Sequence, residues 1–233
     1  MQSADLSVGE SDANGQQTVS LTERAYRRLE EDIAMLRLPP GASVSEGALS
    51  ERCGLGRTPV REALQRLARE GLVRVLPRQG IIVTEIDIAR QLRLLAVRRE
   101  IERLLARSAA ESASDAERTC FAEIADGMEQ AAANNDDTAF MRLDRAFNLL
   151  LLEAGQNEFA AGAMALMNGL SRRFWYMHYR EVADLARAAR LHAAVARAIA
   201  KGIPAAAGEA SDALVDYIAE FTTAATACGK IKG

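Results

Sequence analysis

Hydrophobic residues near the start of the chain recur every three or four positions, which predicts a helix of about four turns with one apolar face. The residues of that face are Tyr26, Leu29, Ile33 and Leu36. Ser20 and Glu23 stand in front of it and predict a capping box, in which each side chain bonds the backbone N–H of the other residue. Pro39-Pro40-Gly41 predicts the end of this segment, because proline cannot continue the hydrogen-bond ladder and glycine permits a reversal.

Two further helices are predicted at short intervals. Residues 46–53 fit a short helix, with Ser45 as its N-cap and Gly54 just past its end. Residues 57–70 fit a longer helix that begins after a tight turn and carries Pro59 in its first turn. Its apolar sector comprises Val60, Ala63, Leu64 and Leu67.

The pattern then changes to that of strands. Residues 72–76 and 81–84 are apolar or β-branched runs on either side of a Pro-Arg-Gln-Gly turn, which is a hairpin signal. Helix, short helix, tight turn, longer helix and hairpin is the order of a winged helix-turn-helix, whose longer helix lies in the major groove of DNA. We therefore predict such a domain over residues 20–85, preceded by a disordered polar arm over residues 1–19.

The polar half of the 57–70 helix is rich in arginine. Its members are Arg57, Thr58, Arg61, Glu62, Gln65, Arg66 and Arg69. An arginine stripe is commonly just a solvated face, but arginine also suits a recognition helix because its guanidinium can donate to O6 and N7 of guanine together. Three features favour DNA binding over a merely solvated face. They are the helix-turn-helix spacing, the positive start of this helix and the basic tip of the hairpin (the wing), which carries Arg78.

Short strings in this segment are together specific to one family. They are Pro-Pro-Gly41, Leu49-Ser-Glu-Arg52, Gly56-Arg-Thr-Pro-Val-Arg-Glu-Ala-Leu64, Arg66-Leu67 and Glu70-Gly-Leu72. They resemble the DNA-binding domain of the GntR family of bacterial transcription regulators. The resemblance implies that operator contacts come from Arg57, Thr58 and Arg61, with Gln65 on the same helix face, and from the wing tip Arg78-Gln79-Gly80. Gly56 departs from the usual Ser or Thr, which removes a phosphate-facing hydroxyl and a stronger N-cap.

Charge is distributed unevenly along the chain. Residues 21–84 hold 11 Arg, no Lys and 8 acidic residues, a net charge of +3, whereas the whole chain has a net charge of −3. A basic domain joined to an acidic remainder is expected when only one domain meets phosphates. The excess is small, so composition permits DNA binding and the motif has to carry the claim.

From Asp87 onward the strand patterns vanish. Six helices are predicted, at residues 87–112, 115–134, 137–154, 157–181, 184–201 and 204–227. Their short connections predict an antiparallel all-α bundle over residues 86–228, so the fold class is mainly α. Three landmarks, Leu94-x3-Arg98-x3-Glu102, Asp144-x3-Asn148 and His192 before Ala198-Ile-Ala-x-Gly202, resemble the FCD effector domain of the FadR-type subfamily.

In many relatives, the FCD domain holds a divalent metal between one Asp and three His, so the resemblance implies such a site here. The whole chain has two histidines, so that set cannot be built. Asp144 and His192 match two of the ligand positions, whereas Asn148 replaces a usual histidine and Leu214 occupies the fourth position. The pair is a weak metal site unless water, Asn148 or effector oxygens complete it. We favour the alternative, in which His192 is a hydrogen-bonded pocket residue without metal.

The string Arg172-Arg173-Phe-Trp-Tyr176-Met-His178-Tyr179 has two interpretations. It is either a core aromatic stripe or the wall of a pocket that offers Arg173 or Arg172 to a small carboxylate, the effector class that the family resemblance implies. The candidate effector-binding residues are Arg98, Asp144, Asn148, Arg173, Tyr176, His178 and His192.

Three functions remain open at this point. The first is an effector-responsive repressor that binds double-stranded DNA, acts in the cytoplasm and is a homodimer on a palindromic operator. The second is an enzyme built on Asp144 and His192, but no nucleophile elbow, His-Glu-x-x-His string or glycine-rich phosphate loop accompanies them. The third is a helical interaction module with a vestigial DNA-binding fold.

Two other classes of protein find no support in the sequence. Cysteine spacing indicates neither a disulfide framework nor a zinc site, and no apolar run is long enough to cross a membrane.

Overall fold

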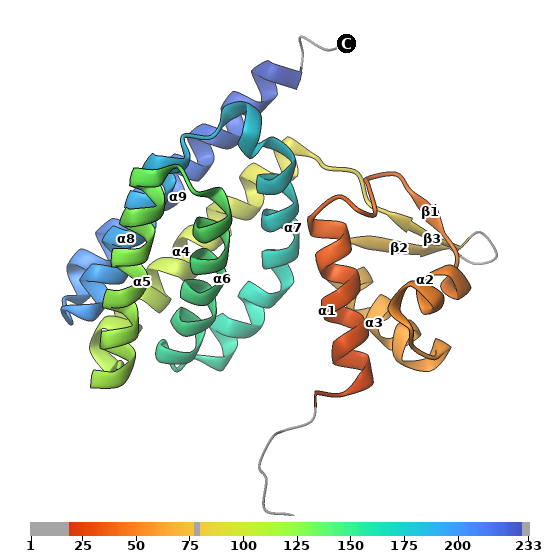
Figure 1. Cartoon of the computed structure of the whole chain (residues 1–233), viewed down its shortest axis with the longest axis horizontal. Helices are drawn as coiled ribbons and strands as arrows, with labels where there is room; N and C mark the ends of the chain where they lie inside the picture. Colours follow the sequence, from red (N-terminus) through yellow and green to blue (C-terminus); the bar gives the residue numbers. More distant parts are fainter. Residues whose placement is uncertain (1–18, 77–79, 230–233) are drawn as a thin grey trace, which may run out of the picture.

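Two domains lie side by side in the computed structural model, which describes residues 19–76 and 80–229 (Figure 1). Among these residues, the smaller domain contains three helices and a small sheet, and the larger one contains six longer helices. An extended segment over residues 84–87 joins them, where the sequence pattern changes from strands to helices.

The first helix, α1 (Leu21–Ala34), begins where the sequence predicts. The Ser20 hydroxyl accepts a hydrogen bond from the backbone N–H of Glu23 over 3.1 Å, which is half of the predicted capping box. The Glu23 carboxylate instead accepts hydrogen bonds from two arginine side chains. The predicted apolar face is too long, because the chain leaves the helix through a left-handed turn at Leu36, with φ of 58°, so the face ends at Ile33.

The next two helices agree with the predicted bounds to within one residue. α2 (Glu46–Cys53) starts at Ser45, whose hydroxyl caps it, and ends at Gly54 with φ of 64°. α3 (Arg57–Arg69) follows after a tight turn. Its N-cap, Gly56, makes no side-chain hydrogen bond, which is the local consequence of losing the usual Ser or Thr.

A three-stranded antiparallel sheet completes the domain, in the order β1-β3-β2. β2 (Val73–Leu76) and β3 (Gly80–Val83) form the predicted hairpin. β1 (Ser43–Val44) pairs with the other edge of β3, and the sequence does not predict it because two residues are too short for an alternating pattern. Gly80 has φ of 93°, and a Cβ there would lie 2.9 Å from the carbonyl oxygen of Val44, so the site requires glycine.

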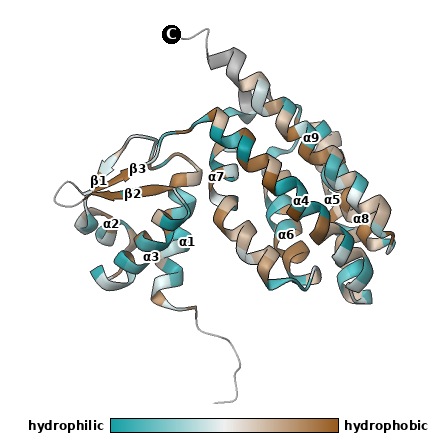
Figure 2. Ribbon diagram, turned by 180° about the vertical axis from the view of Figure 1, so that it is seen from behind, coloured by the Kyte–Doolittle hydropathy of each residue, from teal (hydrophilic) through white to brown (hydrophobic). Residues whose placement is uncertain are grey.

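The hydrophobic core of this domain lies between α1, α3 and the sheet. Its larger buried members are Leu29, Ile33, Val60, Leu64, Leu67, Leu72, Ile81 and Val83. Figure 2 shows β2 and β3 as largely hydrophobic strands, whereas the three helices of this domain carry both hydrophilic and hydrophobic residues.

The larger domain is the antiparallel bundle that the sequence predicts (Figure 1). Its helices are α4 (Ile88–Ser112), α5 (Asp115–Asn134), α6 (Asp137–Ala154), α7 (Glu158–Val182), α8 (Leu185–Ala200) and α9 (Pro204–Gly229). α5 packs along α8 and α4 packs along α9, while α6 and α7 lie against α4. The core includes Leu105, Phe121, Met128, Phe140, Phe147, Leu151 and Ile199. Within the described part of the chain, no helix combines the length and apolar character needed to cross a membrane.

Candidate DNA-binding and effector sites

The predicted contact residues of α3 lie on one exposed face. Its opposite face is buried against the domain core through Val60, Ala63, Leu64 and Leu67. All four predicted contact residues of this helix are exposed: Arg57, Thr58, Arg61 and Gln65. An exposed second helix of a helix-turn-helix is the part that enters the major groove, so the structure brings these four residues together on the expected surface.

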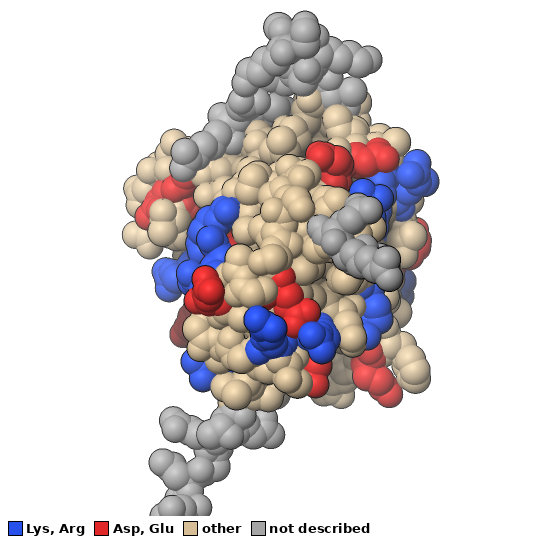
Figure 3. All heavy atoms as spheres, turned by 90° about the vertical axis from the view of Figure 1, so that its right-hand side faces the viewer, with Lys and Arg blue, Asp and Glu red and all other residues tan. Residues whose placement is uncertain are grey.

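Charge on this end of the molecule is mixed. Figure 3 shows Lys and Arg side chains interspersed with Asp and Glu on the side of the molecule that the DNA-binding domain occupies. One such pair joins Arg61 to Glu46, the first residue of α2, over 2.9 Å between Nη2 and Oε1. Sequence reasoning missed Glu46, because two residues on different helices, 15 positions apart, follow no helical spacing.

The wing is described only in part. Gly80 is the first residue of β3 and has a left-handed φ. The predicted contact residues Arg78 and Gln79 lie outside the described residues.

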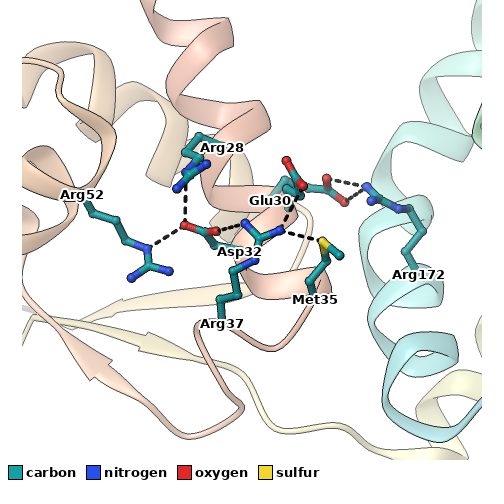
Figure 4. A network of polar contacts seen from close by, with 8 residues as sticks. Arg28, Glu30, Asp32, Met35, Arg37, Arg52 and Arg172 are labelled. Carbon is teal, nitrogen blue, oxygen red and sulfur yellow. Dashed lines mark hydrogen bonds and ion pairs between the residues drawn. The ribbon is translucent and has the colours of Figure 1, made fainter. Parts of the chain in front are cut away.

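A buried carboxylate fixes α2 against α1 (Figure 4). The side chain of Asp32 is fully buried and accepts hydrogen bonds from Arg52 Nε over 2.6 Å and from Arg37 Nη1 over 2.8 Å. On the same helix, Arg28 Nε lies 3.6 Å from Asp32 Oδ2. Burial alone would raise the pKa of Asp32, but the hydrogen bonds and charges of the three arginines outweigh it and lower the pKa.

Arg66 belongs to the polar half of α3, but its partly exposed side chain is turned back onto α1 and Glu70. It stacks over the Tyr26 ring at 3.5 Å from the ring centroid and bonds the Glu70 carboxylate over 3.1 Å. The Tyr26 hydroxyl donates to the same carboxylate over 3.0 Å. Burial raises the pKa of Glu70 and also that of Tyr26. Arg66 therefore anchors α3 to α1.

In the helical domain, Asp144, Asn148 and His192 converge as the sequence predicts. Asn148 Nδ2 donates to Asp144 Oδ1 over 2.9 Å, and His192 Nε2 lies 3.1 Å from the same oxygen. His192 Nδ1 lies 2.8 Å from the Ala188 carbonyl oxygen, which can only accept a hydrogen bond. Both ring nitrogens of His192 therefore face acceptors, an arrangement that favours the protonated imidazolium.

The electrostatics of this pair follow from its neighbours. Burial would raise the pKa of Asp144, but the hydrogen bond and charge of His192 and the charges of Arg98 and Arg172 lower it. Burial would lower the pKa of His192, but the hydrogen bond and charge of Asp144 outweigh it and raise that pKa. Arg98 itself bonds Glu102 over 2.6 Å between Nε and Oε1, and both side chains are largely buried.

Aromatic rings surround His192. The ring centroids of Phe140 and Phe147 lie 5.4 Å and 6.0 Å from that of His192, both in edge-on contact. Trp175 of α7 lies against Phe140, with 6.4 Å between ring centroids. Trp175 thus links α7 to the surroundings of His192, a role that the sequence pattern alone does not distinguish from core packing.

The remaining positions do not supply a four-ligand metal site. Leu214, at the fourth ligand position, is buried in the bundle core, and the Tyr217 hydroxyl donates to the Asp184 carbonyl over 2.9 Å. Asn148 turns its amino group toward Asp144 and so acts as a donor. Among the described residues, no group of three or more His, Cys, Asp and Glu side chains is placed to hold a metal ion. The donors present therefore do not fit the closed tetrahedral site of zinc.

The α7 residues predicted to bind the effector are placed differently. Arg173 is 2% exposed and donates to the Thr84 carbonyl over 2.7 Å, so it lies at the domain junction rather than beside Asp144 and His192. Burial and the nearby charge of Arg90 lower the pKa of Arg173 to about 10. Tyr176 packs against Tyr179, and His178 packs against Phe174 over 4.8 Å between ring centroids. Neighbours on one helix point in different directions, which accounts for this spread.

α7 also holds the DNA-binding domain through Arg172. Its Nη1 donates to both carboxylate oxygens of Glu30 on α1, over 2.8 Å and 2.6 Å (Figure 4). One turn earlier, Gly169 lies so close to the other domain that a Cβ would be 2.6 Å from Leu72 Cδ1. The sequence gives no signal for either contact, because each joins distant segments of the chain.

Comparison with known proteins agrees with this architecture. Residues 21–83 match the family model described as bacterial regulatory proteins, gntR family, and residues 93–217, more than half of the chain, match the FCD domain. A relative from Escherichia coli (strain K12), named HTH-type transcriptional repressor RspR, is 28% identical over 187 residues, which are 79% of this chain and 81% of that protein.

Solved structures share the fold. The structure of E. coli McbR/YncC has a TM-score of 0.77 at 20% identity and covers 90% of this chain and 100% of its own. A putative transcriptional regulator GntR from Rhodococcus sp. RHA1 has a TM-score of 0.64 at 21% identity, with 87% and 98% covered. Both matching families and the named relatives are transcriptional regulators and not enzymes. The chain therefore belongs to the GntR family of bacterial transcriptional regulators, with an FCD domain behind its DNA-binding domain.

Proposed function

We propose that the chain is a repressor that acts in the cytoplasm as a homodimer on a palindromic operator, and that a small organic acid bound in the helical domain controls its affinity for DNA. The position of α7 carries this proposal. One part of its surface bonds the DNA-binding domain through Arg172, and another lies against the aromatic surroundings of His192 through Trp175. A helix that contacts both the DNA-binding domain and the surroundings of His192 can transmit a change from one to the other.

Repression and dimerisation have their own support. The E. coli relative RspR is named a repressor. A single winged helix contacts a short stretch of DNA, whereas a two-fold dimer presents two recognition helices to the two halves of a palindrome. Sedimentation at micromolar concentration is expected to show a dimer. A monomer that binds the operator with full affinity would contradict this part of the proposal.

Polar groups inside an otherwise apolar bundle support a small polar effector. Arg98, Asp144 and His192 come from three different helices, and Phe140 provides an apolar wall beside them. A carboxylate is the favoured class, because two arginines lie within electrostatic range of Asp144. No metal is required in this proposal, since the donors present do not fit the ligand set of the family.

The pairing of charges around Asp144 suggests how the effector acts. Each nearby basic group already faces a carboxylate: Arg98 faces Glu102, His192 faces Asp144, and Arg172 faces Glu30. A carboxylate effector therefore gains a cation only by drawing it away from its present partner. Arg172 is the group whose partner lies in the other domain. We infer that effector binding weakens the contact of α7 with α1 and releases the operator.

The test uses the full chain. An operator is selected from random DNA, and a panel of small mono- and dicarboxylates is screened by thermal shift. An acid that raises the melting temperature is expected to weaken operator binding by about tenfold or more, which is a common size for allosteric coupling.

Variants separate the effector site from general effects. Arg98→Gln and His192→Gln remove the cations proposed to bind the acid, and are expected to lose both the thermal shift and the change in operator affinity. The matched control is Arg145→Gln, on the exposed side of α6, which should keep both. The proposal is wrong if every acid that stabilises the protein leaves operator binding unchanged.

A further inference from the structure

We propose that Glu46 determines part of the DNA sequence specificity of this regulator, because it positions the Arg61 guanidinium for one base pair. Glu46 is the first residue of α2, and Arg61 lies in the second turn of α3. The inference rests on DNA binding through α3. It adds a residue that does not itself have to contact a base.

The contact between the two side chains has the geometry of a fork. Arg61 Nη2 lies 2.9 Å from Glu46 Oε1, and Arg61 Nε lies 3.2 Å from Oε2. Two parallel contacts fix the plane of the guanidinium and the direction in which it points. The N–H groups that remain on Nη1 and Nη2 form a second fork, which suits O6 and N7 of guanine. Because the Arg61 side chain is 63% exposed, that second edge is accessible to DNA.

Positioning matters because arginine is long and flexible. An unpaired arginine on an exposed helix samples many rotamers and loses this freedom when it binds. Glu46 restricts Arg61 before DNA arrives, and it does so from the other helix of the helix-turn-helix. The guanidinium is therefore held relative to the whole motif and not only relative to α3.

Stability does not account for a carboxylate at this place. The pair is exposed on the Arg61 side, and exposed ion pairs contribute little to folding. A negative charge beside a DNA-facing arginine also repels phosphates, so it weakens binding to every DNA sequence. Better discrimination between base pairs by the positioned Arg61 would offset this loss of affinity, and so explains why a carboxylate stands here.

The experiment measures base preference with the full chain. The operator is selected from random DNA, and binding is measured to the operator, to each of its single base-pair variants and to unrelated DNA. Arg61→Ala identifies the base pair that Arg61 reads, as the position where discrimination falls. Glu46→Ala is expected to lower discrimination at that same base pair by about fivefold or more. Its affinity for unrelated DNA should stay the same or rise, and adding it to Arg61→Ala should change nothing further at that position.

The controls distinguish positioning from charge and from folding. Glu51→Ala removes the same charge from the same helix at an exposed position and should leave base preference unchanged. Glu46→Gln keeps the shape of the side chain, and is the variant to compare if Glu46→Ala melts at a lower temperature. The proposal is overturned if both Glu46 variants keep the preference at the Arg61 base pair, or weaken binding to all sequences by one common factor. If Arg61→Ala itself changes no base preference, the recognition-helix assignment fails as well.

Discussion

A single nitrogen of Arg172, Nη1, lies 2.6 Å from one carboxylate oxygen of Glu30 and 2.8 Å from the other, and so joins the helical domain to the DNA-binding domain. The Glu30 side chain is 11% exposed, whereas that of Arg172 is 40% exposed. Removal of Arg172 while the domains stay in contact would leave a largely enclosed carboxylate without its cation, which is costly. The ion pair therefore stabilises the contact between the two domains.

Glu30→Gln is expected to lower the free energy of unfolding by about 1–2 kcal/mol, because a hydrogen bond between charged groups is stronger than one to an amide. In a double-mutant cycle with Arg172→Gln, the coupling should be about 1 kcal/mol, measured by chemical denaturation. The exposed pair Arg187–Glu220 serves as the control and should show coupling close to zero. Equal coupling in both pairs would show that the Glu30 pair does not hold the domains.

Gly169 gives a steric test of the same junction. An added Cβ would lie 2.6 Å from Leu72 Cδ1, and Leu72 is fully buried and cannot swing away. Gly169→Ala should therefore lower the melting temperature, although alanine favours a helix over glycine. Gly162, on the same helix, has nothing within 4 Å of an added Cβ, so Gly162→Ala should raise stability by up to about 1 kcal/mol. Differential scanning calorimetry of the two variants measures their melting temperatures. Shifts of the melting temperature in the same direction for both variants would contradict the prediction.

Local signals in the sequence predict the helices well, because caps and breakers act within a few residues. Ser45 and Gly54 bound α2 as expected, and all six helices of the bundle lie within two residues of their predicted bounds. Contacts between domains have no such signal. Arg173 binds Thr84 across 89 positions, and the aromatic string that contains it gives no hint of this partner. Residue type alone suggests Arg173 as an effector ligand, and residue type does not show in which direction a side chain points.

The convergence of Asp144, Asn148 and His192 was predictable for a different reason. Two of these residues stand four apart on one helix, and the family resemblance placed the third beside them. Glu46 and Asp32 were not predictable, since each binds an arginine from another helix at a spacing that no helical period explains. Polar side chains that act across elements are the part of a site that a single sequence leaves undetermined.

Asp32 should make stability depend on pH. Its pKa in the folded protein lies below the ordinary value of about 3.9, so its ionised form stabilises the fold at neutral pH. That contribution is complete above the unfolded-state pKa and is lost as pH falls through the folded-state pKa. Asp32→Asn is expected to be less stable by about 1–3 kcal/mol at pH 7, since the arginine bonds to a charged acceptor are lost.

The difference between wild type and Asp32→Asn should shrink when denaturation is repeated at successively lower pH below about 4. Asp126→Asn serves as the control, because the Asp126 side chain is 71% exposed and should contribute little. A constant difference from pH 7 to pH 3 would show that the charge of Asp32 does not stabilise the domain.

The recognition helix is tested by operator binding. Arg57→Ala and Arg61→Ala should each cost about 1–3 kcal/mol on the selected operator and relax base preference, as expected when a contact to a base edge is lost. Arg145→Ala removes the same charge from the helical domain and should bind the operator as wild type does. For the wing, Arg78→Ala should weaken binding to operator and unrelated DNA to a similar degree. Operator affinity unchanged in both α3 variants would refute the assignment of this helix.

The last prediction concerns metal. Zinc or nickel should bind weakly or not at all without an effector, because Asp144 and His192 supply two ligands and a closed tetrahedral site needs four. Asn148 faces Asp144 with its amino group, and Leu214 is buried among apolar side chains, so neither position completes the set. A divalent ion would also have to replace the hydrogen bond between His192 and Asp144, with the imidazole deprotonated.

Metal content is measured by mass spectrometry on protein purified without chelator or affinity tag, and again after Asp144→Ala. We expect far less than one metal ion per chain in both samples, and no change in melting temperature when a chelator is added to wild type. Stoichiometric metal in wild type that disappears in Asp144→Ala would show that a reduced ligand set suffices. In that case effector oxygens or water must complete the coordination, and the effector would be recognised through the metal instead of through Arg98 and Arg172.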